Sequence, residues 1–206
     1  EAKVDDCLDK INLSASHLLA LVNDVLDMNK LESGKETIES ASFDLKHLMD
    51  DVASLVNAQI TEMGITHCTH RGELTHTRLI GSPLRLRQIM LNLFSNAIKY
   101  NKPGGTIDTY AGEVSCDGTR VVYEFRITDS GIGMSSEFIE KELFHPFTQE
   151  KSGARTQYKG TGLGMSIVKE LIEKMQGTIE VTSQQGVGTT YVFPVSYTHL
   201  RAHETL

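Results

Sequence analysis

The sequence predicts an α/β fold, a two-layer sandwich in which a mixed sheet carries helices on one face, preceded by a long helix. Three patterns point to this arrangement. Amphipathic helical periodicity recurs along the chain, β-branched and alternating runs separate the helical stretches, and residues 1–35 contain no proline and only one glycine, near their end. Helices and strands that alternate in this way pack as layers around one core.

Size and composition limit what the chain can be. Its 206 residues suffice for one domain and an appendage. A net charge of −7 argues against a nucleic-acid partner, since phosphate backbones attract basic patches. The 3 cysteines are widely spaced and indicate neither a zinc site nor a disulfide framework. Without a long apolar run or a signal peptide, we expect this piece to be cytoplasmic without membrane contact, and inner-membrane anchoring of a parent protein stays open.

The first 35 residues are predicted to form a helix with an apolar stripe. Apolar residues recur there at spacings of three and four, the pattern of a seam that packs against partner helices. A helix with such a stripe has no core of its own and must pair, either with other helices or with the domain that follows. The stripe comprises Leu8, Ile11, Ala15, Leu18, Val22 and Val25.

A second amphipathic helix is expected from residue 45 to residue 60. Short strands follow at 65–68 and 78–80. Ser82 and Pro83 then begin a third helix, because Ser is a good N-cap and the first helical turn accepts Pro.

The third helix carries three polar residues on one face. Asn92, Asn96 and Lys99 lie at i, i+4 and i+7, so their side chains can converge on one ligand. An amide oxygen such as that of Asn96 suits Mg²⁺, which takes one or two protein oxygens besides phosphate oxygens and water. Lys99 can offset phosphate charge. The alternative is an ordinary amphipathic helix with solvated amides.

Two further strands are predicted at 106–114 and 121–127, and the second leads to Asp129. A carboxylate at this position can accept a hydrogen bond from an exocyclic amine. Gly131 and Gly133 would let the backbone approach a ligand without a Cβ clash. A strand-to-turn Asp that binds no ligand is the alternative.

Glycines within residues 160–164 open the last predicted helix, at 165–175. Such a start exposes backbone N–H groups and the positive end of the helix dipole, which favours an anion such as phosphate. No predicted strand directly precedes these glycines, so a Rossmann dinucleotide motif is excluded. The polar segment 148–159 is predicted to be a loop, in which Arg155 and Lys159 are either phosphate contacts or merely solvated charges.

The final predicted element is a β-hairpin. Runs at 178–183 and 189–193 alternate between polar and apolar residues and flank a turn that contains glycine. These two strands complete the predicted mixed sheet.

Four short motifs, at residues 92–100, 129–133, 144–147 and 160–164, together resemble the N, G1, F and G2 boxes of sensor histidine protein kinases. The ATP-binding domain of that family shares a superfamily with DNA gyrase and mismatch-repair ATPases. The resemblance therefore implies an ATP-binding domain with ATP and Mg²⁺ as cofactors.

The resemblance also implies a role for each matching residue. Asn96 would hold the metal, Asp129 would bind the adenine amino group and so favour ATP over GTP, and Asn92 is the single candidate for a catalytic role. Phe144 and Phe147 would anchor an ATP lid. The implied ATP-binding residues are Asn92, Asn96, Lys99, Tyr100, Asp129, Gly131, Gly133, Arg155, Lys159, Gly160, Thr161, Gly162, Leu163, Gly164 and Thr189.

By the same resemblance, residues 1–35 are the second helix of a dimerisation and phosphoacceptor hairpin, 36–42 are a linker, and 43–195 are the catalytic ATP-binding domain. Such a hairpin implies a homodimer. Residues 196–206 fit no part of the family pattern and look like a translated sequencing adapter or a cloning remnant, a non-native tail. We expect its deletion to leave nucleotide affinity unchanged.

The implied function is transfer of the ATP γ-phosphoryl group to a histidine, and from there to an aspartate of a response-regulator receiver domain. No histidine of the chain has the family's phosphoacceptor setting, and His17 and His145 stand in other contexts. We infer that the phosphoacceptor helix lies upstream of Glu1.

Three alternatives to histidine phosphotransfer stay open. One is an ATPase of the gyrase or mismatch-repair kind, which carries Glu at the position of Asn92, where a carboxylate can activate water. Another is a regulatory module that binds a nucleotide without phosphotransfer. The third is a serine kinase related to anti-sigma factors, which needs no dimerisation hairpin.

Overall fold

The computed structural model describes residues 38–150 and 160–199, together with nine positions between residues 15 and 29. Seven strands form its sheet, and most of them fall where the sequence predicts strands. They are β1 (Ala41–Asp44), β2 (Thr66–Arg71), β3 (Arg78–Gly81), β4 (Thr106–Cys116), β5 (Arg120–Asp129), β6 (Glu180–Gln184) and β7 (Gly188–His199).

The sheet is mixed, with the strand order β1-β3-β7-β5-β4-β2, and β6 pairs with β7 off this path. Only the pairing of β2 with β4 is parallel among these strands. β7 is long enough to pair with β6 near its start and with β3 at its end, while β5 lies along its other side. The predicted mixed sheet is therefore confirmed.

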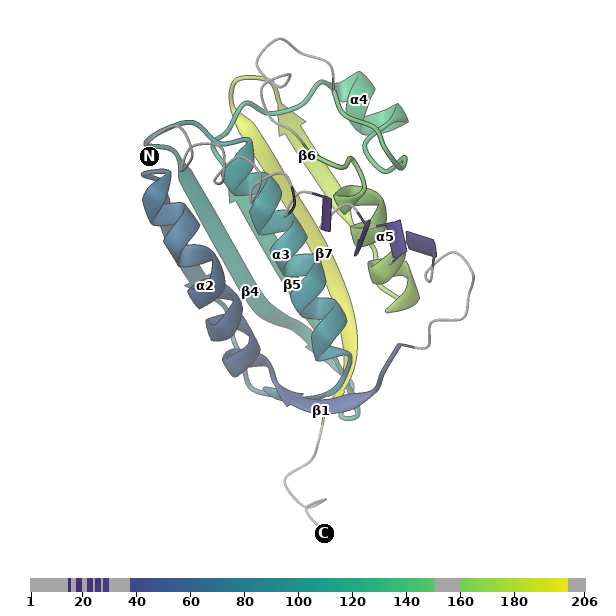
Figure 1. Ribbon diagram of the computed structural model, residues 1–206. Helices are drawn as coiled ribbons and strands as arrows, with labels where there is room; N and C mark the ends of the chain where they lie inside the picture. Colours follow the sequence, from purple (N-terminus) through teal and green to yellow (C-terminus); the bar gives the residue numbers. More distant parts are fainter. Residues whose placement is uncertain are drawn as a thin grey trace, which may run out of the picture.

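Three helices lie side by side on one face of the sheet (Figure 1): α2 (Leu45–Glu62), α3 (Pro83–Lys99) and α5 (Gly164–Lys174). A short helix that the sequence did not predict, α4 (Ser136–Lys141), contacts β6. Asp44 caps α2 by accepting from the His47 amide, and Ser82 caps α3 by accepting from the Arg85 amide. The predicted α/β sandwich with helices on one face is confirmed.

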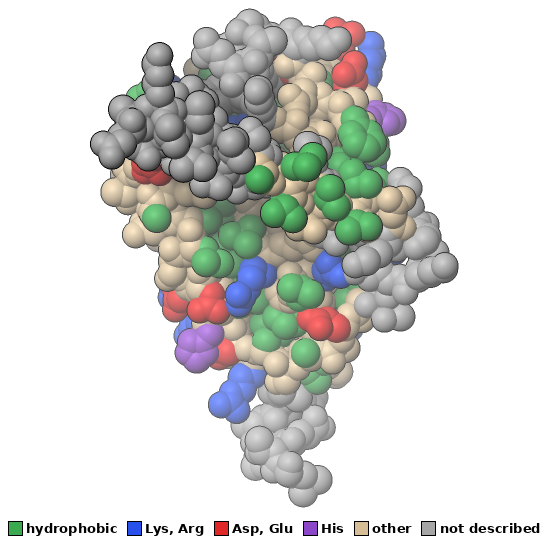
Figure 2. All heavy atoms as spheres, viewed as in Figure 1, with side chains coloured by type: hydrophobic (Ala, Val, Ile, Leu, Met, Phe, Trp, Pro, Cys, Tyr) green, Lys and Arg blue, Asp and Glu red, His purple; other side chains and the backbone are tan. Residues whose placement is uncertain are grey.

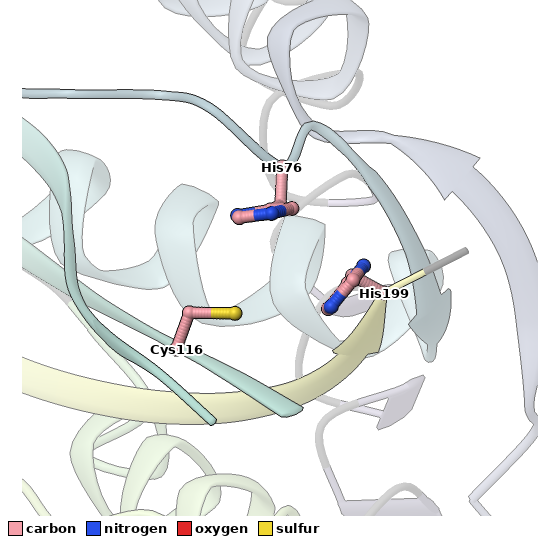
Figure 3. Close-up of side chains that lie close together, drawn as sticks. All are labelled: His76, Cys116 and His199. Carbon is pink, nitrogen blue, oxygen red and sulfur yellow. The ribbon is translucent and has the colours of Figure 1, made fainter. Parts of the chain in front are cut away.

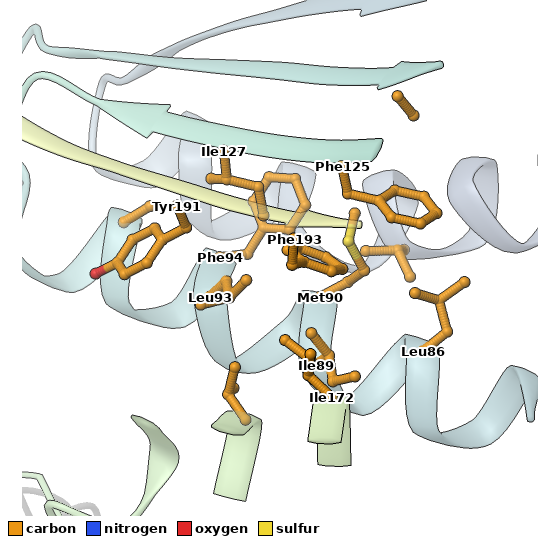
Figure 4. Packing of buried hydrophobic residues seen from close by; sticks show 14 of the residues in the cluster. Leu86, Ile89, Met90, Leu93, Phe94, Phe125, Ile127, Ile172, Tyr191 and Phe193 are labelled. Carbon is orange, nitrogen blue, oxygen red and sulfur yellow. The ribbon is translucent and has the colours of Figure 1, made fainter. Parts of the chain in front are cut away.

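The core lies between the sheet and the helices α2, α3 and α5, and Figure 4 shows its part around α3. α3 buries its apolar stripe there because its hydrophobic residues recur at helical spacing, while the strands contribute alternate residues. Phe125 on β5 and Phe193 on β7 stack with ring centroids 5.1 Å apart. Fully buried residues of this region include Leu86, Ile89, Leu93, Phe125, Ile127, Ile172 and Phe193. This packing fixes the position of α3 against β5 and β7.

Acidic and basic side chains are interspersed among hydrophobic ones on the face that carries the helices (Figure 2). Two exposed ion pairs join α2 to its surroundings, Arg71 to Asp50 at 2.6 Å and Arg87 to Asp51 at 3.0 Å. Exposed pairs of this kind contribute at most about 1 kcal/mol each. The described residues on this face form no continuous basic stripe, which accords with the net charge of −7.

The first and last strands of the sheet extend beyond the predicted domain boundaries at residues 43 and 195. β1 starts at Ala41, inside the predicted linker, because residues 41–44 pair with β3. β7 continues through residues 196–199, part of the predicted non-native tail, and pairs there with β5 and β3. Tyr197 is only 3% exposed. Residues 196–199 thus belong to the folded sheet, and 200–206 lie outside the described residues.

Tyr197 provides a test of this extension. Its ring packs edge-on against Phe43, with centroids 5.7 Å apart, and Gly81 leaves room for it. Its hydroxyl is buried without a hydrogen-bond partner among the described residues. We expect Tyr197→Ala to lower the free energy of unfolding by about 3 kcal/mol in urea denaturation. Tyr197→Phe keeps the ring and removes the unsatisfied hydroxyl, so it should be neutral or stabilising. Equal stability of the Ala variant would show that residues 196–199 contribute nothing to the fold.

The described positions between residues 15 and 29 are all helical, in line with the predicted first helix. Leu18, Val22 and Val25 of the predicted stripe are exposed, whereas Met28 packs against the domain core. Ala15 of the stripe is exposed as well, and Leu8 and Ile11 lie outside the described residues. Among the helices that the structure describes, none has the length and apolarity to cross a bilayer.

Candidate nucleotide-binding site

The C-terminal half of α3 presents Asn92, Asn96 and Lys99 on the face turned away from the core. Their neighbours Leu93, Phe94, Ala97 and Ile98 are buried, which fixes the rotation of the helix and leaves the two amides and the ammonium half-exposed. The Lys99 Nζ donates to the Tyr100 hydroxyl at 3.0 Å. The helical spacing predicted from the sequence therefore does place these side chains together.

Asp129 ends β5 and is only 6% exposed. Its Oδ1 accepts from the Gly131 amide at 2.9 Å and from the Thr189 amide at 3.3 Å. The antiparallel register of β5 and β7 sets Thr189 directly opposite Asp129. The Thr189 hydroxyl in turn shares a hydrogen bond with Ser183, at 2.8 Å. The carboxylate is thus held in one orientation by the backbone of two segments.

Glycines are required close to Asp129. A Cβ on Gly131 would overlap the Tyr100 carbonyl oxygen, and a Cβ on Gly133 would overlap the Gln184 carbonyl oxygen. Gly133 also has a φ of 63°, a left-handed conformation that favours glycine. Neither glycine lines the cavity described below. They act by letting the chain after Asp129 pack against its neighbours.

The glycine segment 160–164 leads into α5, and no side chain of the described residues caps the first turn of that helix. The Leu163 amide donates to the Thr161 hydroxyl at 3.1 Å, and Leu163 itself is fully buried. Because the first N–H groups of a helix have no intrahelical acceptor, this end suits an anion. A helix that starts here can bind phosphate through its backbone.

These elements meet at one cavity of about 420 Å³. α3, the end of β5, the glycine segment and β7 all line it, although they are far apart in sequence. Of the predicted nucleotide ligands, Gly131, Gly133 and Leu163 lie outside its lining, and Arg155 and Lys159 lie outside the described residues. The predicted residues that line it are Asn92, Asn96, Lys99, Tyr100, Asp129, Gly160, Thr161, Gly162, Gly164 and Thr189.

The cavity is also lined by residues that were not predicted from the sequence. Most come from residues 134–150, including the unpredicted α4, and their types carry no pattern that marks a site. Glu150 accepts from the Ser135 amide at 3.0 Å, which ties the end of this segment to the start of α4. The missed lining residues are Ser95, Met134, Phe138, Leu143, Thr148, Gln149, Glu150, Met165 and Tyr191.

The segment between Phe147 and Gly162 is joined at its two ends. The Phe147 amide donates to the Gly162 carbonyl at 3.0 Å, and both residues have positive φ, 63° and 73° respectively. Phe144 packs against the core, whereas Phe147 is 67% exposed. The two phenylalanines of the predicted lid hinge therefore differ, and only Phe144 anchors it in the core.

Gly162 is expected to be sensitive to substitution. A Cβ there would lie 2.8 Å from the Phe147 carbonyl carbon and 2.9 Å from the Thr148 carbonyl oxygen. We expect Gly162→Ala to weaken binding of an ATP analogue about tenfold, since left-handed strain of ~1–2 kcal/mol adds to this clash. Gly104→Ala is the matched control, because Gly104 has a φ of 71° and open space around its Cβ position. If both variants bound the analogue alike in calorimetry, close packing at Gly162 would be irrelevant to the site.

Comparison with known proteins agrees with this geometry. The sequence model of the family described as histidine kinase-, DNA gyrase B-, and HSP90-like ATPases matches residues 81–199, which include every element that lines the cavity. The chain belongs to this ATPase family. The match ends at residue 199, where β7 also ends.

Relatives within this ATPase family are histidine kinases. The chain is 38% identical over 188 residues to hybrid signal transduction histidine kinase B of Dictyostelium discoideum, covering 91% of the chain and 9% of that protein. It is 37% identical over 191 residues to signal transduction histidine-protein kinase BarA of Escherichia coli K12, covering 93% of the chain and 21% of that protein. The chain thus spans at most about a fifth of the length of these relatives.

A solved structure has a similar fold. Full-length ShkA, crystallised in complex with AMPPNP, superposes with a TM-score of 0.79 at 28% identity, covering 98% of this chain and 40% of that one. The family membership and the similar fold agree with an ATP-binding cavity. Sequence motifs alone had already indicated this family.

Proposed function

We propose that this chain is the ATP-binding catalytic part of a histidine kinase, which transfers the ATP γ-phosphoryl group to a histidine. The observation that carries the proposal is the convergence of Asn92, Asn96, Lys99 and Asp129 with the glycine segment 160–164 on one cavity. Relatives that are histidine kinases and match more than nine-tenths of the chain support it.

The adenine end of the nucleotide fits the environment of Asp129. This buried carboxylate is fixed by two backbone amides, so it can accept a hydrogen bond from an exocyclic amine without reorganising. Guanine offers a carbonyl at the corresponding edge and would be repelled. The volume of about 420 Å³ also lies within the range of small-molecule sites.

The phosphate end fits the other side of the cavity. Lys99 supplies positive charge beside Gly160, and the uncapped start of α5 supplies backbone N–H groups. The Asn96 side-chain oxygen is the protein ligand that we assign to Mg²⁺, which supplies charge neutralisation to the phosphates when bound. Catalysis by these residues consists mainly of positioning the phosphates and excluding water.

Asn92 separates this proposal from the ATPase alternative. Its amide cannot act as a general base toward water. Gyrase-type enzymes carry a Glu at this position, and its carboxylate can activate water. The acceptor is instead a histidine on a dimerisation hairpin, and the phosphoryl group then passes to a response-regulator aspartate. We further propose that the first helix pairs with its hairpin partner in a cytoplasmic homodimer, as its exposed Leu18, Val22 and Val25 would allow.

The test is phosphotransfer in trans. The chain is incubated with Mg²⁺, γ-labelled ATP and a separately produced dimerisation hairpin from a relative, which carries the phosphoacceptor histidine. We expect label on the hairpin that is labile in acid and stable in alkali, and no label when that histidine is replaced by Gln. Asn92→Ala should slow transfer at least about tenfold, as expected for loss of a polar contact to the bound phosphates.

The matched control for Asn92 is Asn57→Ala, because Asn57 is an exposed amide on α2 that does not line the cavity. This variant should transfer phosphate at the unmodified rate. Steady ATP hydrolysis without the hairpin, abolished by Asn92→Ala, would instead support the ATPase alternative and overturn the proposal.

A further inference from the structure

Three residues from neighbouring strands form one row across the sheet at the cavity. Thr189 on β7 pairs with Asp129 of β5 on one side and with Ser183 of β6 on the other. Residues directly opposite each other in a sheet point their side chains to the same face. Asp129 and Thr189 line the cavity, whereas Ser183 is half-buried and does not line it. Ser183 can therefore affect a ligand only through the groups that it binds.

The Ser183 hydroxyl has three hydrogen-bonding neighbours. Its oxygen accepts from the Met134 amide at 2.8 Å. The Gly188 carbonyl oxygen and the Thr189 hydroxyl oxygen each lie 2.8 Å from it as well. A serine hydroxyl has one proton to donate and two lone pairs that accept, so three partners use its full capacity.

This capacity fixes the direction of each hydrogen bond. The Met134 amide can only donate and the Gly188 carbonyl can only accept, so the single proton of Ser183 goes to Gly188. Without that proton, lone pairs of Ser183 and Gly188 would face each other at 2.8 Å and repel. The remaining bond is then donated by the Thr189 hydroxyl to Ser183. The proton of Thr189 thus points toward Ser183.

The backbone around this network has little freedom. A Cβ on Gly188 would overlap the Asp129 carbonyl oxygen, so β7 and β5 approach closely there. The Gly186 amide in the β6–β7 turn donates to the Ile132 carbonyl at 2.8 Å. The turn is therefore tied to the segment that follows Asp129, and the acceptor of the Ser183 proton keeps its place.

The direction of this bond decides what Thr189 offers to a ligand. Its hydroxyl proton is used by Ser183, and the hydroxyl has no other hydrogen-bond partner among the described residues. A hydroxyl that has donated its proton presents only lone pairs, so it accepts from an N–H group and repels a carbonyl oxygen. Asp129 beside it is an acceptor too. The cavity wall thus presents two acceptors at this point.

We propose that Ser183 is a positioning residue for nucleotide specificity, because it keeps the Thr189 hydroxyl an acceptor for the exocyclic amine of adenine, directly or through one water. An amine carries two N–H groups, which suits two acceptors. This proposal rests on the proposed binding of ATP at Asp129, and it adds a residue that itself touches no nucleotide.

The test compares two nucleotides by calorimetry with Mg²⁺: ATP, and purine riboside triphosphate, which differs from ATP only in lacking the amine. ATP should bind the unmodified chain more tightly. Ser183→Ala should reduce the ratio of the two affinities about three- to tenfold, mainly by weakening ATP, since the Thr189 hydroxyl loses its fixed direction. Ser183→Thr keeps a hydroxyl at this position and should restore the ratio.

Thr189→Val tests whether Ser183 acts through Thr189. Valine removes the hydroxyl and leaves the backbone bond from residue 189 to Asp129 in place. The ratio should fall as it does in Ser183→Ala, and the double variant should show no further fall. Thr190→Val is the matched control, because Thr190 shares a hydroxyl hydrogen bond with Thr128 at 3.0 Å and does not line the cavity. It should leave both affinities unchanged.

The role of Ser183 is overturned if a folded Ser183→Ala variant keeps the ratio of the unmodified chain, or if it binds both nucleotides equally more weakly, as general damage to the site would cause. Additive effects of Ser183→Ala and Thr189→Val would overturn it as well. In these cases the unmodified chain still binds ATP, and the proposed function stands. An unmodified chain that binds neither nucleotide would overturn the proposed function together with this proposal. The Tm of each variant reports whether it folds.

Discussion

Asp129→Asn is expected to reduce the affinity for an ATP analogue by between about tenfold and 150-fold, the effect of losing a hydrogen bond to a charged group worth ~1.5–3 kcal/mol. The substitution keeps the size of the side chain but removes its charge. The preference for ATP over GTP should shrink as well, because a neutral amide no longer repels the guanine carbonyl. Calorimetry with both analogues measures the two effects.

The control for this substitution is Asp108→Asn on the neighbouring strand β4. Asp108 is half-exposed and lies 3.6 Å from His70, remote from the cavity lining. Affinity for both analogues should be unchanged in that variant. A folded Asp129→Asn variant with undiminished affinity would remove Asp129 from the nucleotide site, and the Tm of each variant shows whether it has folded.

Asn96→Ala is expected to abolish the Mg²⁺-dependent part of nucleotide affinity. The unmodified chain should bind the ATP analogue at least about tenfold more tightly with Mg²⁺ than with chelator, since the metal screens phosphate charge and Asn96 is the protein ligand that we propose for it. In the Ala variant the two titrations should coincide. Because the side chain is only half-buried, we expect little change in Tm.

Asn57→Ala serves as the control for this substitution too, and its Mg²⁺ dependence should match that of the unmodified chain. If Asn96→Ala retained the full Mg²⁺ effect, the metal would have another protein ligand. Glu150 would be the next residue to substitute, because its carboxylate lines the same cavity.

The fold followed from the sequence where residue periodicity and capping acted locally. The stripes of α2, α3 and α5, the Ser82 cap and the alternation of β5 each depend on residues close in sequence, so each was predicted. Leu55 shows the limit of this reasoning, since it belongs to the apolar set of α2 and yet is 56% exposed. Burial depends on what packs against a helix, which periodicity does not specify.

The elements that the sequence missed depend on pairing over long distances. β1 forms because residues 41–44 pair with β3. Residues 196–199 form the end of β7 because they pair with β5 and β3. Their own composition gives no strong signal for a strand. α4 is a single short helix whose cap, Ser135, is its main local feature.

Part of the candidate site was predicted because, like the apolar stripes of the helices, it shows local sequence patterns. Asn92, Asn96 and Lys99 share a helix face, and Asp129 ends a strand, so their residue types and positions were informative without tertiary knowledge. The apolar lining from residues 134–150 was not predicted, since such residues occur throughout any core. The sequence also gave no sign that His76, Cys116 and His199 lie close together at one end of the sheet (Figure 3), because only strand pairing brings these residues together.

The most direct test of the central claim is calorimetric titration of a non-hydrolysable ATP analogue into the unmodified chain, Asn96→Ala and Asp129→Asn, each with Mg²⁺ and with chelator. We expect one Mg²⁺-dependent equivalent for the unmodified chain and a loss of affinity in both variants. Tight binding that ignores both substitutions would contradict the assignment of the cavity, and an unmodified chain that binds no analogue would contradict the proposed ATP-dependent function.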